Sequence, residues 1–128
     1  KVLAGIFASM LFLTGCSSAG SATNMGASEF IAKISEPGVV IVDVRTPEEF
    51  AAGHLQGAVN IDVSSSNFES QITALDKSGT YAIYCRSGNR AGQAIDIMRE
   101  IGFTGQLVNG GSVANASSEL SLEVVVDQ

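Results

Sequence analysis

The sequence predicts an α/β domain built on a parallel β-sheet, and three observations support that prediction. The chain has 128 residues, which is enough for one domain and not for two. From residue 27 onward, strand-like apolar runs alternate with segments in which apolar residues recur at helical spacing. The clearest of the strand-like runs is continuously apolar, as expected for a strand that is buried on both faces of a sheet.

The first helix is predicted at residues 27–34, whose apolar residues share one face, and Glu36-Pro37-Gly38 closes it. A β-branched run at 39–44 follows and predicts a buried strand. The next helix begins with Thr46-Pro47-Glu48-Glu49, in which the threonine can cap, the proline suits the first helical position and the second glutamate completes a capping box. Gly53 is expected to end this helix.

The second half of the chain continues the alternation. Residues 54–58 are expected to form a turn into a short strand at 59–61, and apolar spacing predicts a helix around 68–75. A buried strand is predicted at 80–84, and a last parallel strand at 106–108 follows the helix after Arg90.

The most informative segment is Tyr84-Cys85-Arg86-Ser87-Gly88-Asn89-Arg90, which places a cysteine at the carboxyl end of a strand and on a loop that opens into a helix. Ligands bind at this end of the strands in open α/β sheets. The loop N–H groups, the helix dipole and the two arginines favour an anion there, so we expect the Cys85 thiolate to be a nucleophile. The candidate substrate-binding residues are Arg86, Ser87, Gly88, Asn89 and Arg90. A buried core cysteine is the alternative, but arginines this close would be costly to bury unpaired.

The N-terminal residues predict export. An uncharged apolar run of signal-peptide length follows Lys1 and is shorter than a membrane-spanning helix. It ends in Leu13-Thr14-Gly15-Cys16, which resembles the bacterial lipobox, whose cysteine is lipidated. We therefore expect a lipoprotein signal at 1–16, a flexible tether at 17–26 and the domain at 27–128, anchored to a membrane and facing the periplasm or the cell exterior. A plain secretory signal with an incidental cysteine is the alternative.

Composition excludes several classes of function. If Cys16 carries lipid, Cys85 is the only thiol left, so neither an internal disulfide nor a dithiol oxidoreductase is expected. The net charge of −6 without a basic stripe is a poor match to nucleic-acid binding. One histidine and two cysteines in unrelated contexts cannot build a zinc site, and we expect neither metal nor cofactor.

Three segments, at 43–50, 53–61 and 84–91, resemble a single rhodanese domain in this order. The resemblance extends from residue 27 to 111. It implies an α/β fold with a central parallel five-stranded sheet and helices on both faces.

The resemblance also implies sulfurtransferase chemistry. The Cys85 thiolate would attack the outer sulfur of thiosulfate or a similar donor, release sulfite and become a persulfide, which cyanide or a thiol, including that of a protein, would then accept. Arg86 and Arg90 are the candidates for holding the oxyanion of the donor. Arg90 has an alternative structural role, in which it pairs with a carboxylate such as Asp43. Asp43 and Arg45 are expected to brace the end of the sheet.

Other interpretations remain open at this level. A persulfide carrier for a protein partner needs the same loop as an enzyme, so the sequence does not separate the two. Rhodanese-fold phosphatases and arsenate reductases have five residues between cysteine and arginine, whereas four separate Cys85 from Arg90 here. His54 is expected to be a hydrogen-bonded turn residue rather than a catalytic base. Family members commonly carry a tryptophan helix after the paired glycines, but this chain has no tryptophan, and residues 120–126 alternate like a possible strand.

Overall fold

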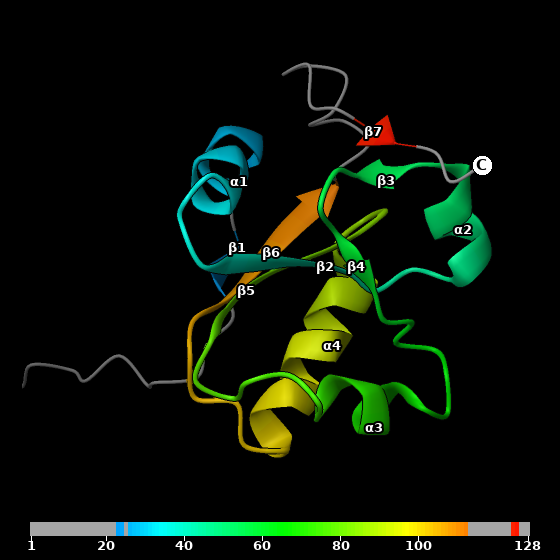
Figure 1. Ribbon diagram of the computed structural model, residues 1–128, viewed down its shortest axis with the longest axis vertical. Helices are drawn as coiled ribbons and strands as arrows, with labels where there is room; N and C mark the ends of the chain where they lie inside the picture. The colour runs from blue at the N-terminus through cyan, green and yellow to red at the C-terminus, as the bar shows by residue number, and fades with distance from the viewer. Residues whose placement is uncertain (1–22, 25, 113–123, 126–128) are drawn as a thin grey trace, which may run out of the picture.

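A parallel β-sheet with helices against it organises the computed structural model, which describes residues 23–24, 26–112 and 124–125 (Figure 1). In chain order the elements are β1 (Thr23–Asn24), α1 (Ala27–Ile34), β2 (Val39–Asp43), α2 (Pro47–Ala52), β3 (His54–Leu55), β4 (Val59–Asn60), α3 (Phe68–Ile72), β5 (Thr80–Cys85), α4 (Asn89–Glu100), β6 (Leu107–Ser112) and β7 (Val124–Val125).

The main sheet has five strands in the order β1-β6-β5-β2-β4, and every neighbouring pair is parallel. Strand β5 lies at its centre, between β2, where Val39 pairs with Thr80, and β6, where Leu107 pairs with Tyr81. All carboxyl ends of these strands therefore lie at one edge of the sheet, and the predicted five-stranded parallel α/β fold is confirmed.

Helices cover both faces of the sheet, as predicted. Figure 1 shows α1 on one side of the sheet and α3 and α4 on the other. The side chains of β5 alternate between the two cores: Ala82 and Tyr84 pack with Phe30 of α1, whereas Ile83 and Cys85 pack in the core that includes α4. The Cys85 side chain therefore lies on the same face of the sheet as α4, the helix that follows it in the chain.

The apolar face of α4 is buried as its spacing predicts, through Ala91, Ala94, Ile95 and Met98. The start of α2 has the predicted capping box, in which Thr46 accepts from the Glu49 N–H and Glu49 accepts from the Thr46 N–H. None of the described helices has the length and apolar character needed to cross a membrane.

Several predicted boundaries were wrong, among them that of the helix expected around 68–75, which ends at Ile72. Thr23–Asn24, placed in the tether, form β1 beside β6. His54–Leu55, placed in a turn, form β3 and pair with Val124–Val125 of β7, within the tail where a strand was considered. Strand β6 continues past residue 108 to Ser112. Short strands of this kind form because a partner strand offers free backbone groups. A segment of two residues is too short to show the alternating pattern from which a strand is predicted.

Candidate active site

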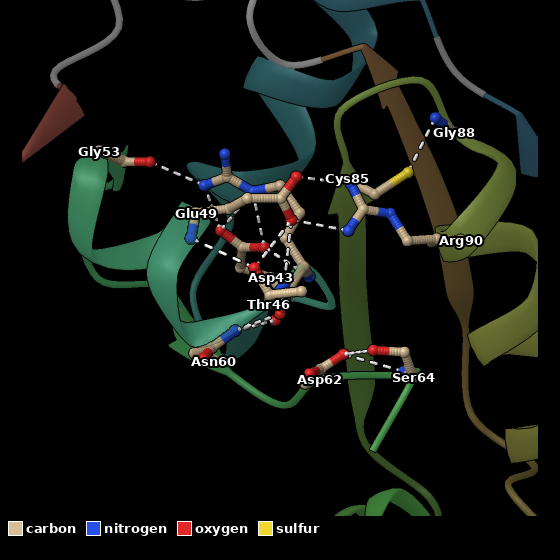
Figure 2. A network of polar contacts seen from close by, with 11 residues as sticks. Asp43, Thr46, Glu49, Gly53, Asn60, Asp62, Ser64, Cys85, Gly88 and Arg90 are labelled. Atoms are coloured by element: carbon tan, nitrogen blue, oxygen red, sulfur yellow. Dashed lines mark hydrogen bonds and ion pairs between the residues drawn. The ribbon is translucent and has the colours of Figure 1, made fainter.

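Cys85 is the last residue of β5, and the loop after it turns directly into α4. Gly88, the residue before the helix, has a φ of 92°, a left-handed conformation that favours glycine. This conformation lets the chain reverse, and the Gly88 N–H donates a hydrogen bond of 2.9 Å to Sγ of Cys85 (Figure 2). The predicted loop N–H donor is therefore present at the sulfur, at the positive end of the α4 dipole.

The side chains of the loop differ in exposure. Cys85 is 1% exposed. Arg86, Ser87 and Asn89 are exposed. The Arg86 guanidinium makes no hydrogen bond or ion pair with another described residue, which leaves its charge available to an anion.

Arg90 is held by a carboxylate of another helix. Its Nη1 donates to Oε2 of Glu49 at 2.6 Å and its Nη2 donates to Oε1 at 3.1 Å (Figure 2). This bond lowers the pKa of Glu49 to about 2, against the effect of burial and with help from the Thr46 bonds. The same bond raises the pKa of Arg90, and the nearby Cys85 contributes in the same direction. The suggested pairing of Arg90 with Asp43 was wrong, because α2 places Glu49 within reach and Asp43 has another partner.

That partner is Arg45. Asp43 is fully buried and accepts from Arg45 Nη2 at 2.6 Å and from Arg45 Nε at 3.0 Å. Arg45 also donates to the carbonyl oxygen of Gly53 at 2.7 Å, and the hydrogen bond to Asp43 raises its pKa. The pair joins the end of β2 to the end of α2, which confirms the predicted bracing role.

Tyr84 extends this bracing to the residue before the cysteine. Its hydroxyl accepts a hydrogen bond of 3.0 Å from the N–H of Leu55, and the Arg45 guanidinium lies 5.6 Å from its ring centre. Burial raises the pKa of the Tyr84 phenol well above its usual value, so the hydroxyl stays neutral. Tyr84 thus links β5 to β3 through this hydrogen bond.

His54 has the structural surroundings expected of it. Its Nδ1 lies 2.8 Å from the carbonyl oxygen of Phe50, and its ring stacks on the Phe50 ring at 3.6 Å between centres. The predicted hydrogen bond is present, although the residue belongs to β3 and not to a turn.

Of the predicted loop residues, Gly88 contacts Sγ of Cys85, Arg90 is paired with Glu49, and Arg86, Ser87 and Asn89 are exposed, while Cys16 lies outside the described residues. Two residues that bind the cysteine loop were not predicted to do so. Glu49 was assigned only to its helix start, and Asn109 was not considered, although a polar residue directly after an apolar strand-like run is a signal for a specific partner. The described residues contain no group of three or more histidine, cysteine, aspartate or glutamate side chains that could hold a metal ion.

Comparison with known proteins gives a consistent family. The model of the rhodanese-like domain matches residues 26–117. Thiosulfate sulfurtransferase PspE of Escherichia coli is 38% identical over 63 residues, covering 49% of this chain and 61% of that protein. Thiosulfate sulfurtransferase GlpE of Pseudomonas aeruginosa is 33% identical over 79 residues, with 61% and 69% covered. Thiosulfate:glutathione sulfurtransferase of Saccharomyces cerevisiae is 30% identical over 89 residues, with 61% and 64% covered. The chain thus spans less than two thirds of PspE and of the yeast protein.

Solved structures show the same fold. A rhodanese-related protein from Thermoplasma volcanium superposes with a TM-score of 0.67 at 24% identity, covering 82% of this chain and 99% of that one. A rhodanese from E. coli, solved with anions, superposes with a TM-score of 0.56 at 33% identity, covering 70% and 99%.

Proposed function

Because this chain belongs to the rhodanese-like domain family, we propose that it is a sulfurtransferase that moves sulfane sulfur through a persulfide on Cys85. The observation that carries the proposal is the Gly88 N–H at 2.9 Å from Sγ, at the start of α4. A hydrogen-bond donor in this position stabilises negative charge on the thiolate and on the terminal sulfur of the persulfide. The relatives named thiosulfate sulfurtransferases support thiosulfate or a similar anion as the donor.

The proposed reaction has two displacements. The Cys85 thiolate attacks the outer sulfur of thiosulfate, a new S–S bond forms, and the original S–S bond breaks with its electron pair leaving on sulfite. The persulfide then gives its terminal sulfur to an acceptor. With cyanide, the new bond is carbon–sulfur, thiocyanate leaves and the Cys85 thiolate is restored.

The charges around the loop suit the first displacement. Arg86 is exposed and without a described partner, so we assign it to the sulfonate oxygens of the donor. Arg90 is assigned first to Glu49, because two hydrogen bonds already hold it. That the E. coli rhodanese was solved with anions supports an anionic ligand for a protein of this fold.

The first test is the intact mass of the full chain after incubation with thiosulfate. We expect a gain of one sulfur atom that persists in Cys16→Ala and is absent in Cys85→Ala. Thiosulfate:cyanide kinetics on the same samples separate the enzyme from the carrier, because an enzyme shows saturable turnover. A stable persulfide with negligible turnover would favour the carrier, and a wild-type protein that gains no sulfur would contradict thiosulfate as the donor.

We also propose that Cys16 is lipidated and tethers the domain to a membrane, a proposal that rests on the lipobox-like sequence. Metabolic labelling with a radioactive fatty acid in a bacterium that expresses the precursor tests it. Label is expected in the wild type and not in Cys16→Ala, and label in neither protein would contradict the proposal.

A further inference from the structure

Asn109 is a buried polar residue in β6, next to the cysteine strand. It is 7% exposed, its register partner in β5 is Ile83, and two glycines follow it. A buried side-chain amide is costly unless both its donor and its acceptor are satisfied. The partners of Asn109 therefore show why an amide occupies this place.

Both ends of the amide bind backbone. Nδ2 donates to the carbonyl oxygen of Gly88 at 3.0 Å, and Oδ1 accepts from the N–H of Gly111 at 2.9 Å. One partner is an acceptor and the other is a donor, so only one orientation of the amide satisfies both. Asn109 thereby ties the cysteine loop to the end of β6.

Gly88 is held on its other side by the cysteine itself. Its N–H donates to Sγ of Cys85, while its carbonyl is bound by Asn109 and also accepts the first helical hydrogen bond, from Gly92. An added Cβ on Gly88 would lie 3.2 Å from the Cα of Gly111, so the loop packs closely on the strand end. Within the described part of the chain, Asn109 is the one side chain from outside the loop that bonds the backbone of residues 86–88.

We propose that Asn109 is a positioning residue for Cys85: by fixing the carbonyl of Gly88, it keeps the Gly88 N–H directed at Sγ. The role of this thiolate in sulfur transfer rests on the proposed function, but the orientation of the N–H and its effect on the thiolate do not. Loss of the Asn109 amide leaves the Gly88 carbonyl held only by the Gly92 N–H, so that the loop can turn, the Gly88 N–H leaves the line to Sγ, and the Cys85 thiolate loses a charge-assisted hydrogen bond.

The chain offers a matched control in Asn60. Its Nδ2 also donates to backbone carbonyl oxygens, those of Asp43 at 3.1 Å and Arg45 at 2.9 Å, and it lies at the end of β4. Asn60→Ala therefore removes a comparable amide-to-backbone clamp from the same sheet without touching the cysteine loop.

The test measures alkylation of Cys85 by iodoacetamide in a Cys16→Ser background, where Cys85 is the only thiol. At about pH 7 we expect Asn109→Ala to react about threefold more slowly than the parent, because the weaker stabilisation of the thiolate is partly offset by its greater nucleophilicity, and we expect Asn60→Ala to react at the parent rate. At about pH 10, where cysteine thiols are largely ionised, Asn109→Ala is expected to react at least as fast as the parent, and Asn60→Ala at the parent rate. Asn109→Asp keeps the acceptor for Gly111 and loses the donor to Gly88, so it is expected to react at least as slowly as Asn109→Ala at pH 7.

Urea unfolding of every variant identifies those that are folded under the assay conditions, and Asn109→Asp replaces Asn109→Ala if the latter is not. Three outcomes would overturn the proposal: a folded Asn109 variant that reacts like the parent, equal slowing in Asn60→Ala, or slowing that persists at pH 10. Failure of the wild type to take sulfur from thiosulfate would contradict thiosulfate as the donor and leave the proposal for Asn109 standing, because alkylation needs no sulfur donor.

Discussion

The ion pair between Glu49 and Arg90 gives a prediction with a defined pH dependence. Glu49→Gln removes the charge that pairs with Arg90, while the remaining amide oxygen can still accept from the Thr46 N–H and preserve the helix cap. The substitution therefore isolates the charge of the pair from the hydrogen bonds of the capping box.

Exposure sets the size of the effect. Holding the pKa of Glu49 at about 2 instead of 4.5 would correspond to about 3 kcal/mol for a group fully shielded from water. The Glu49 and Arg90 side chains are 34% and 30% exposed, however, so solvent screens the pair. We therefore expect Glu49→Gln to lower the free energy of unfolding by about 1 kcal/mol at neutral pH.

The folded protein holds the Glu49 proton less tightly than the unfolded chain does. The stabilisation is therefore complete above pH 4.5 and is lost as the pH falls toward about 2. Urea unfolding of the wild type and of Glu49→Gln, measured at steps across this range, is expected to show two curves that are separated near neutral pH and converge in acid.

Glu48→Gln is the matched control. Glu48 lies in the same first turn of α2, so that Glu48→Gln changes the net charge and the interaction with the helix dipole in the same way. Glu48 has no ion pair with a described residue. We expect it to cost less than Glu49→Gln. Equal costs for the two variants, or a Glu49→Gln deficit that stays constant down to pH 2.5, would refute the assignment of this stability to the Arg90 pair.

Two further substitutions test the loop and its support. Gly88→Ala should lower the free energy of unfolding by about 1–2 kcal/mol in urea and also abolish sulfur loading from thiosulfate, because the left-handed backbone and the close Gly111 both resist a Cβ. Gly57→Ala is its control, since Gly57 has a similar φ but open space around it. This variant should show the same backbone strain and keep full sulfur loading. Tyr84→Phe should lower the free energy of unfolding by about 1–3 kcal/mol, since the buried Leu55 N–H loses its acceptor, and an unchanged thermal unfolding curve would contradict that role.

The sequence predicted the fold class and the cysteine loop well because both leave local signals. The continuous apolar run of β2 and the helical spacing of α4 identify buried elements without any tertiary information. The capping box at Thr46 is likewise a local pattern, with both of its hydrogen bonds formed between residues three apart. The loop after Cys85 could be predicted because it lies between a recognisable strand, β5, and a recognisable helix, α4.

The remaining features depend on contacts between distant residues. Arg90 could have paired with any carboxylate near the carboxyl end of the sheet, and only the placement of α2 selects Glu49 over Asp43. Strand β3 exists through its pairing with β7, about seventy residues later. Asn109 gains its role from the loop opposite, which the sequence of β6 does not contain.

The central place of β5 has a consequence for when the surroundings of Cys85 form during synthesis. Both neighbours of β5 are distant in sequence, and one of them, β6, comes after it. Contacts of this kind require long stretches of chain to close before they form. While the chain is being made, Cys85 and its loop therefore exist before the strand that flanks them and before the Asn109 clamp. We expect the Gly88 N–H to be fixed at Sγ only with the last part of the domain, since a ribosome-bound chain that ends before residue 107 lacks both β6 and the Asn109 clamp.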